Sequence, residues 1–179
     1  MKVLIPLVDG FEEIEAITII DVLRRAKIDV TVVGLITTVV EGSHNIKVII
    51  DKRFSEINPE QFDALVLPGG SPGYINLANS NTILNLVKDF NQKKKIIGAI
   101  CGAPIVLAKA GILEDKIATC YPGLENKIPR PREGSVIVDK NIITSKGPGT
   151  AMSFALKLVE ILAGKKEMMR LREELVFSE

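Results

Sequence analysis

Short apolar runs alternate with helical patterns through most of the chain. Runs of strand length occupy residues 2–7, 29–33, 64–67 and 96–100. Apolar residues at helical spacing fill residues 13–26 and 81–90, and Pro104 is suited to the first turn of a further helix. Because parallel strands need crossover helices, this alternation predicts an α/β fold whose doubly wound, mostly parallel sheet is covered by helices on both faces.

The remaining segments complete one domain over residues 1–179. Two β-branched runs, 37–40 and 46–50, flank a Gly-containing loop and predict a hairpin that interrupts the βαβ rhythm. The other expected elements are short strands at 117–119, 135–138 and 142–144, a long helix at 151–163 and a last amphipathic helix at 166–176. No linker or repeat divides the sequence.

Composition and charge exclude several classes of protein. The 179 residues carry 23 Lys and Arg against 22 Asp and Glu, and this balance gives no electrostatic case for a nucleic-acid or membrane partner. No apolar run approaches the roughly 18 residues of a membrane span, and the first apolar run is too short for a signal peptide. We therefore expect a cytoplasmic protein whose two cysteines are thiols.

Cys101 is the sharpest candidate for chemistry. It follows the most apolar strand and precedes a predicted helix, and Gly102 suits a tight strand-to-helix corner. Such a corner resembles a nucleophile elbow, although the G-x-S-x-G motif is absent. We expect the sulfur to lie at a helix N-terminus, where partial positive charge favours a reactive thiolate. The alternative is a small buried hydrophobic residue.

Two further features belong to the same expected edge of the sheet, because ligands bind beyond the carboxyl ends of parallel strands. Glu15 lies on an otherwise apolar helical face, so it is either a buried, protonated carboxyl that moves a proton or a solvated first-turn residue. Gly69 and Gly70 follow another strand and offer backbone N–H groups to an oxyanion, or simply form a tight turn.

The other titratable residues are weaker candidates for a role in catalysis or binding. His44, the only histidine, falls in the predicted hairpin loop, so a Cys/His dyad within one chain is not expected. Cys120 is interpreted as structural. Metal-ligand spacings and nucleotide-binding glycine motifs are missing, so we expect no metal and no organic cofactor.

Five motifs in register resemble the DJ-1/PfpI (ThiJ) superfamily, and its DJ-1 branch in particular. They are GFEEIEA at 10–16, DVLRRA at 21–26, LPGG at 67–70, AICGAP at 99–104 and TSKGPGT at 144–150. The resemblance implies a flavodoxin-like fold, related to class I glutamine amidotransferases, and a homodimer. It also implies an oxidisable nucleophile at Cys101, a protonated partner at Glu15 and an oxyanion pocket at Gly69 and Gly70.

The resemblance implies several activities: glyoxalase or deglycase action on small dicarbonyls without glutathione, redox sensing, chaperone action and proteolysis. Gly102 stands where the protease-like branch has a histidine, which argues against proteolysis. Tyr121 precedes Pro122 where several members have a histidine, and tyrosine is a poor base near neutral pH. Arg25 matches a position near the pocket entrance. His44 matches a hairpin segment that approaches the partner subunit's site, so both are candidates for binding an anion.

Overall fold

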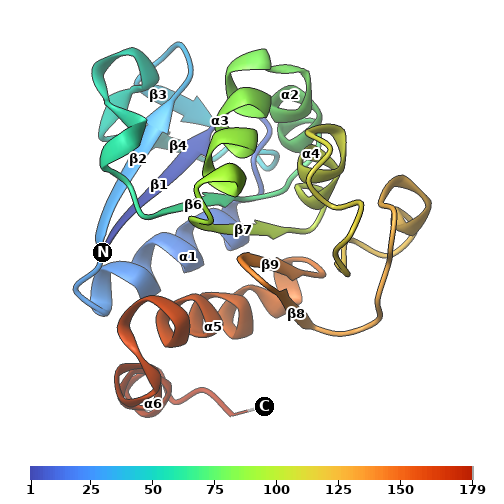
Figure 1. Ribbon diagram of the computed structural model, residues 1–179. Helices are drawn as coiled ribbons and strands as arrows, with labels where there is room; N and C mark the ends of the chain where they lie inside the picture. Colours follow the sequence, from blue (N-terminus) through green and yellow to red (C-terminus); the bar gives the residue numbers. More distant parts are fainter. Residues whose placement is uncertain (179) are drawn as a thin grey trace.

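A seven-stranded sheet forms the middle layer of the protein (Figure 1). The computed structural model describes residues 1–178. The sheet strands are β1 (Lys2–Leu7), β2 (Asp29–Gly34), β5 (Lys52–Arg53), β6 (Ala64–Leu67), β7 (Ile96–Ile100), β8 (Val136–Asp139) and β9 (Ile142–Ser145). Their order is β5-β2-β1-β6-β7-β9-β8, and β8 alone runs antiparallel to its neighbour. The central order confirms the predicted flavodoxin-like α/β class, with its switch point between β1 and β6.

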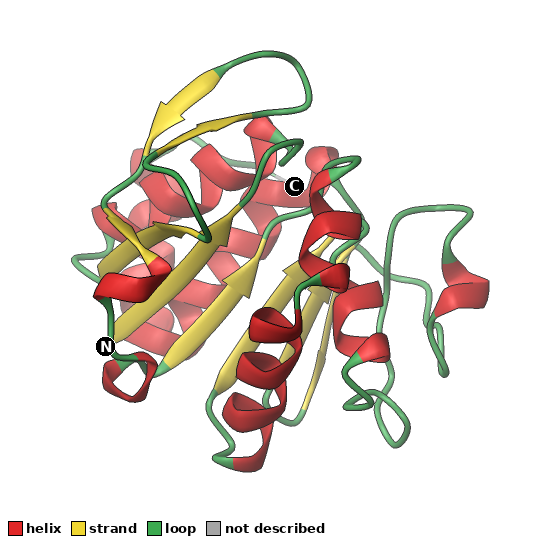
Figure 2. Cartoon of the chain, turned by 90° about the horizontal axis from the view of Figure 1, so that it is seen from above, coloured by secondary structure: helices red, strands yellow, loops and turns green. Residues whose placement is uncertain are grey.

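Helices cover both faces of the sheet (Figure 1). They are α1 (Glu13–Arg25), α2 (Gly73–Asn79), α3 (Asn81–Gln92), α4 (Pro104–Lys109), α5 (Ala151–Ala163) and α6 (Lys165–Glu174). The α1 and α5 helices lie on one face, whereas α2, α3 and α4 lie on the other. The predicted hairpin is β3 (Val39–Glu41) and β4 (Lys47–Ile49), which projects beyond the main sheet (Figure 2).

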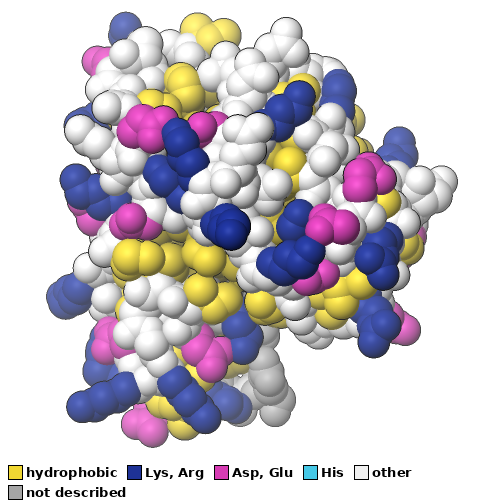
Figure 3. All heavy atoms as spheres, in the orientation of Figure 1, with side chains coloured by type: hydrophobic (Ala, Val, Ile, Leu, Met, Phe, Trp, Pro, Cys, Tyr) yellow, Lys and Arg dark blue, Asp and Glu magenta, His cyan; other side chains and the backbone are white. Residues whose placement is uncertain are grey.

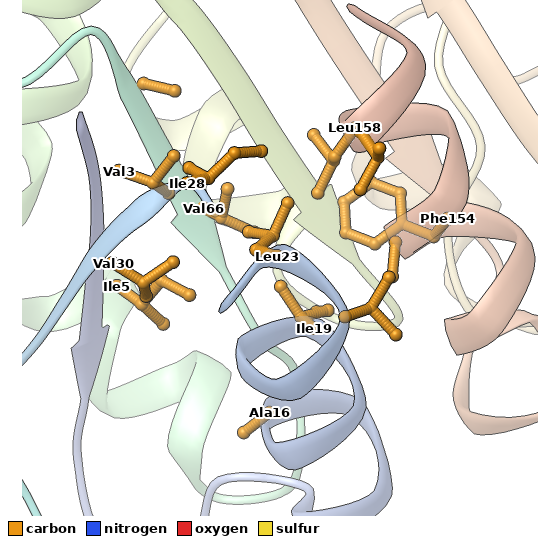
Figure 4. Close-up of a cluster of buried hydrophobic side chains, with 14 of the residues drawn as sticks. Val3, Ile5, Ala16, Ile19, Leu23, Ile28, Val30, Val66, Phe154 and Leu158 are labelled. Atoms are coloured by element: carbon orange, nitrogen blue, oxygen red, sulfur yellow. The ribbon is translucent and has the colours of Figure 1, made fainter. Parts of the chain in front are cut away.

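Each face of the sheet has its own hydrophobic core. Alternate side chains of β1 enter different cores, because successive residues of a strand point to opposite faces. Figure 4 shows the first core, in which Ile19 of α1 lies between strand residues such as Ile5 and the Phe154 ring of α5. Leu65 enters the second core beneath α3 and α4. This two-sided burial explains why the central strands read as continuous apolar runs.

The expected strand at 117–119 is wrong. Ala118 forms only an isolated bridge to Pro131. The neighbouring N–H groups are bound by side chains, since Ile117 N donates to Asp139 Oδ2 at 2.8 Å and Thr119 N to Thr144 Oγ1 at 2.9 Å. With those donors engaged, the ladder does not extend. The structure also adds β5 and α2, which sequence analysis did not predict.

The surface carries charges of both signs. Lys and Arg side chains are interspersed with Asp and Glu on the face shown in Figure 3, in keeping with a formal net charge of +1. Among residues 1–178, no helix combines the length and the apolar character needed to cross a bilayer.

Candidate active site

Cys101 occupies a sharp turn immediately after β7. Its φ of 64° lies in the left-handed region, which a residue with a side chain adopts only when its surroundings hold it there. Two hydrogen bonds do so: Cys101 N donates to Ser145 O at 2.9 Å, and Tyr121 N donates to Cys101 O at 2.8 Å. The half-buried side chain therefore stands at the carboxyl edge of the sheet, as the elbow prediction required.

Glu15 points inward from the first turn of α1. Its side chain is fully buried, because it lies on the same side of the helix as Ala16 and Ile19 of the first core. Oε2 accepts a hydrogen bond from Gly69 N at 2.7 Å. Oε1 is buried and has no hydrogen-bond partner within residues 1–178. Of the two interpretations that the sequence left open, the structure supports the buried one.

Gly69 is the point where the two reactive side chains meet. A Cβ atom at this position would lie 2.6 Å from Cys101 Cβ and 2.9 Å from Glu15 Oε2. Any side chain there would displace the thiol or the carboxyl. The proposed role of Gly69 as an oxyanion donor is wrong, because its N–H is already bound to Glu15.

Burial sets the proton affinity of both groups. It raises the pKa of Glu15 to about 7, although the Gly69 N–H and the Cys101 thiol act to lower it. Burial, followed by the charge of Glu15, raises the pKa of Cys101 to about 12, against the lowering effect of the Gly70 and Gly102 N–H groups. Two such groups titrate as a unit, so the pair loses its first proton near pH 7 and carries at most one negative charge over the neutral range.

The prediction that the N-terminus of the following helix holds Cys101 as a thiolate is therefore not supported. The α4 helix begins three positions after Cys101 and contains only six residues. Burial, which removes hydration from the sulfur, is the largest influence on the pKa of Cys101 and raises it. The donors that favour negative charge on the sulfur are instead the peptide N–H groups of Gly70 and Gly102.

Gly70 and Gly102 also make room for the walls of the site. Gly70 has a φ of 96°, and a Cβ there would meet Glu12 N at 2.2 Å, so glycine lets the loop after β6 pack against the loop after β1. A Cβ at Gly102 would meet the Tyr74 ring at 2.4 Å. Tyr74 therefore lies directly on the backbone beside the nucleophile.

An open cleft of about 460 Å³ leads to the sulfur. Tyr121 lines it, as predicted, with 48% of its surface exposed. Sequence analysis missed Tyr74 and Leu124, although Tyr74 follows the Pro- and Gly-rich segment after β6 and could have been found from that position. The full lining is Glu12, Gly70, Ser71, Tyr74, Cys101, Gly102, Tyr121, Pro122, Gly123, Leu124 and Pro148.

Arg25 does not line this cleft. It is the last residue of the 13-residue α1, about 15 Å along the helix axis from Glu15. Its guanidinium pairs with Asp21 at 2.8 Å and with Glu174 at 3.2 Å. The expectation that Arg25 stands near the pocket entrance is wrong within one chain.

His44 lies in the hairpin loop, where its side chain is 69% exposed and outside the cleft lining. Its Nδ1 lies 2.9 Å from Glu13 Oε2, and its backbone N donates to Glu13 Oε1 at 2.7 Å. Burial would raise the pKa of Glu13, but the His44 ring and nearby N–H groups lower it to about 2. Glu13 thus anchors the hairpin.

Glu12 completes a cluster with Glu13 and His44. One ligand atom of each residue lies within 4.8 Å of the others. Local sequence spacing does not reveal this cluster, because the hairpin brings His44 next to Glu13, 31 positions away in the sequence. Cys120 is buried, and burial raises its pKa to about 11, in keeping with a structural cysteine.

Comparison with known proteins agrees with this fold. A flavodoxin-like sheet with a cysteine at the elbow defines the class, and the model of the DJ-1/PfpI family matches residues 1–161. The chain belongs to the DJ-1/PfpI family. It is 39% identical to Protein dj-1beta of Drosophila melanogaster over 97% of this chain and 95% of that protein. It is 36% identical to Glutathione-independent glyoxalase DJR-1.2 of Caenorhabditis elegans over 92% of this chain and 89% of that protein.

The backbone is also similar to solved structures. That of oxidized Toxoplasma gondii DJ-1 superposes with a TM-score of 0.96 at 37% identity, covering 99% of both chains. Protein DJ-1 homolog B of Arabidopsis thaliana is 39% identical over 95% of this chain. The chain spans only 40% of that relative's length.

Proposed function

We propose that the protein is a cysteine-dependent enzyme that converts small 2-oxoaldehydes to 2-hydroxy acids without glutathione. The observation that carries the proposal is the half-buried Cys101 beside the fully buried Glu15, at the end of a cleft of about 460 Å³. The resemblance to the glutathione-independent glyoxalase of C. elegans supports the reaction type.

In the first step the Cys101 sulfur attacks the aldehyde carbon while Glu15 takes the thiol proton. A C–S bond forms as the C=O π bond breaks, and Glu15 returns the proton to the oxygen to give a hemithioacetal. The N–H groups of Gly70 and Gly102, already directed at the sulfur, lie beside the developing negative charge. A carboxylate whose pKa is about 7 is matched to this work near neutral pH.

The second step moves a proton within the substrate. Glu15 removes the proton from the former aldehyde carbon to give an enediol and delivers it to the neighbouring carbon, while the hydroxyl proton of the hemithioacetal passes to the former ketone oxygen. The first carbon is thereby oxidised to a thioester and the second is reduced to an alcohol. Water then hydrolyses the thioester, releasing the 2-hydroxy acid and the free thiol. The net reaction consumes one water and needs no external oxidant, reductant or cofactor. Tyr121 has no part in the proton transfers.

The test is a glutathione-free assay of methylglyoxal with lactate as the measured product. The wild-type protein is expected to form lactate, and Cys101→Ser is expected to lose that activity to the level of buffer. Cys120→Ser is the matched control, because it removes the other thiol outside the cleft lining. Equal lactate yields from wild type and Cys101→Ser would overturn the proposal.

A second candidate function is redox sensing through oxidation of Cys101. The observation that favours it is Tyr121, which supplies no general base to speed turnover. Peroxide would oxidise the thiol to sulfenic acid and a second peroxide would oxidise that to sulfinic acid, each oxidation releasing water. Mass spectrometry after mild peroxide treatment distinguishes the two functions, because sulfinate at Cys101 without dicarbonyl turnover supports sensing. A chaperone function instead predicts that Cys101→Ala still suppresses aggregation.

We also propose a cytoplasmic homodimer. Ile14 and Ile17 are exposed on one face of α1, by 58% and 43%, and Ile46 in the hairpin is 57% exposed. Covering such side chains with a second copy would remove apolar surface from water. Sedimentation equilibrium at micromolar concentration is expected to give twice the chain mass of 19.5 kDa. A monomer would contradict the assembly without bearing on the reaction.

A further inference from the structure

Two aromatic side chains line the cleft that leads to Cys101. The sequence contains two tyrosines and no tryptophan, and both tyrosines line the cleft that leads to Cys101. Large phenylalanines such as Phe90 and Phe154 are buried in the cores instead. The cleft therefore presents two aromatic rings to whatever enters it.

Both rings are held against glycine backbone. The Tyr74 ring covers Gly102, where an added Cβ would lie 2.4 Å from ring atom Cδ1. The Tyr121 ring lies beside Gly147, where an added Cβ would lie 3.2 Å from Cδ2. The Tyr121 backbone is tied to the nucleophile through its N–H, 2.8 Å from Cys101 O. Each ring is thus positioned by contacts with the structure around the reactive sulfur.

The rest of the open cleft is mostly apolar and carries little charge. Pro122, Leu124 and Pro148 contribute apolar surface, and Glu12 is the one acidic or basic side chain among the described lining residues. A carboxylate there disfavours an anionic substrate. The volume of about 460 Å³ falls within the range of pockets for drug-sized ligands and far exceeds the need of methylglyoxal, whose substituent is a single methyl group.

We propose that the site is built for neutral 2-oxoaldehydes that carry an aryl substituent, with the aryl ring held against Tyr74 and Tyr121. This inference rests on the proposed function, and it names the substrate class. The chemistry is unchanged: the thiol adds to the aldehyde carbon, and an aryl glyoxal plus water becomes an aryl 2-hydroxy acid. Stacking of one ring on another stabilises the complex beyond the burial of area alone.

The kinetic test compares kcat/KM for phenylglyoxal with kcat/KM for methylglyoxal. Their ratio cancels changes in the chemical machinery that affect both substrates. Tyr121→Leu is expected to lower the phenylglyoxal-to-methylglyoxal ratio by roughly 2- to 10-fold, and Tyr74→Leu to do the same. Tyr121→Phe keeps the ring and is expected to keep the ratio. An unchanged ratio in both leucine variants would overturn the proposal.

A binding measurement separates this inference from the proposed reaction. Protein with labelled tyrosine rings gives NMR signals from Tyr74 and Tyr121 alone, and both report on the cleft. Acetophenone, which has the aryl ketone half of phenylglyoxal but no aldehyde, is expected to shift these signals saturably, whereas acetone is not. Saturable shifts without dicarbonyl turnover would uphold the ligand class while the reaction fails. Turnover of methylglyoxal with no acetophenone-induced shift would reject the ligand class alone.

Discussion

Glu13 and Glu15 are separated by a single residue on α1, both are buried, and their pKa values are shifted in opposite directions. Glu13 is 6% exposed and its pKa is lowered to about 2, whereas Glu15 is fully buried and its pKa is raised to about 7. The two carboxyls differ in the hydrogen-bond donors that surround them. Glu13 meets the side chains of Ser43 and His44 and the backbone of the hairpin, while Glu15 meets one N–H and the Cys101 thiol, a weak donor. Donors, rather than burial alone, make one carboxyl structural and leave the other able to exchange protons.

The largest expected effect separates the two glutamates by activity. Glu15→Gln removes the proposed proton acceptor and is expected to lower kcat/KM for a 2-oxoaldehyde by roughly 10²- to 10⁴-fold. Glu13→Gln, which alters only the hairpin anchor, is expected to stay within a few-fold of wild type. Both variants are assayed at pH 8 after their folded state is checked by circular dichroism. Equal losses in the two variants would remove the functional distinction between them.

The next effect concerns the reactivity of the sulfur. In the wild type, alkylation of Cys101 by iodoacetamide is expected to increase with pH through about 7, where the pair loses its first proton. In Glu15→Gln no carboxylate accepts the thiol proton during the attack, so this increase near pH 7 is lost. The pKa of the thiol itself falls when the Glu15 charge is removed, but burial keeps it above the ordinary value. At pH 7.5 the loss of the proton acceptor is expected to make the variant react at least about 10-fold more slowly. Peptide mass spectrometry distinguishes Cys101 from Cys120, which serves as the internal reference.

A smaller effect is expected on the free energy of unfolding, and it differs in direction between the Glu13→Gln and Glu15→Gln variants. Glu13→Gln weakens hydrogen bonds to an ionised acceptor and is expected to lower the free energy of unfolding by about 1–3 kcal/mol. Glu15→Gln at pH 8 replaces a poorly solvated carboxylate with a neutral group of the same shape, so the free energy of unfolding is expected to remain or increase. Urea unfolding measures both. A loss of stability in both variants would contradict the distinction.

The smallest effect is the slope of stability against pH. The folded pKa of Glu13 lies below its ordinary value, so its contribution to stability is lost as pH falls from about 4.5 to about 2. The folded pKa of Glu15 lies above its ordinary value, so its contribution is lost as pH rises from about 4.5 to about 7. Thermal scans across pH are expected to show that Glu15→Gln flattens the second decline and Glu13→Gln the first. If Glu15→Gln leaves the second decline intact, Glu15 is not the group responsible.

The parts of the fold that sequence predicted best are those fixed by local pattern. The strands at Ala64–Leu67 and Ile96–Ile100 and the helix Ala151–Ala163 have the predicted limits, because their apolar residues are buried where the chain pattern places them. The strand predicted at residues 117–119 is wrong, since the N–H groups of Ile117 and Thr119 are bound by side chains from β8 and β9. No local pattern carries that information.

In the candidate site, too, some features follow from local sequence and others depend on how distant segments pack. The corner at Cys101 follows from its own neighbours in sequence, and Tyr121 enters the cleft as predicted. The partner of the Gly69 N–H and the direction of Glu15 depend on how α1 docks beside β6. The raised pKa of Cys101 depends on the depth at which the sulfur lies, which residue type and helix position do not specify.

The contact of three separate chain segments at Gly69 links chemistry to completion of the fold. Glu15 lies on α1, Gly69 follows β6 and Cys101 follows β7, so the pair exists only when these segments have docked. A nascent or partly folded chain would carry an ordinary cysteine. The reactivity of this thiol therefore reports whether folding is complete. The change in its alkylation rate during refolding would measure when the last of these segments docks.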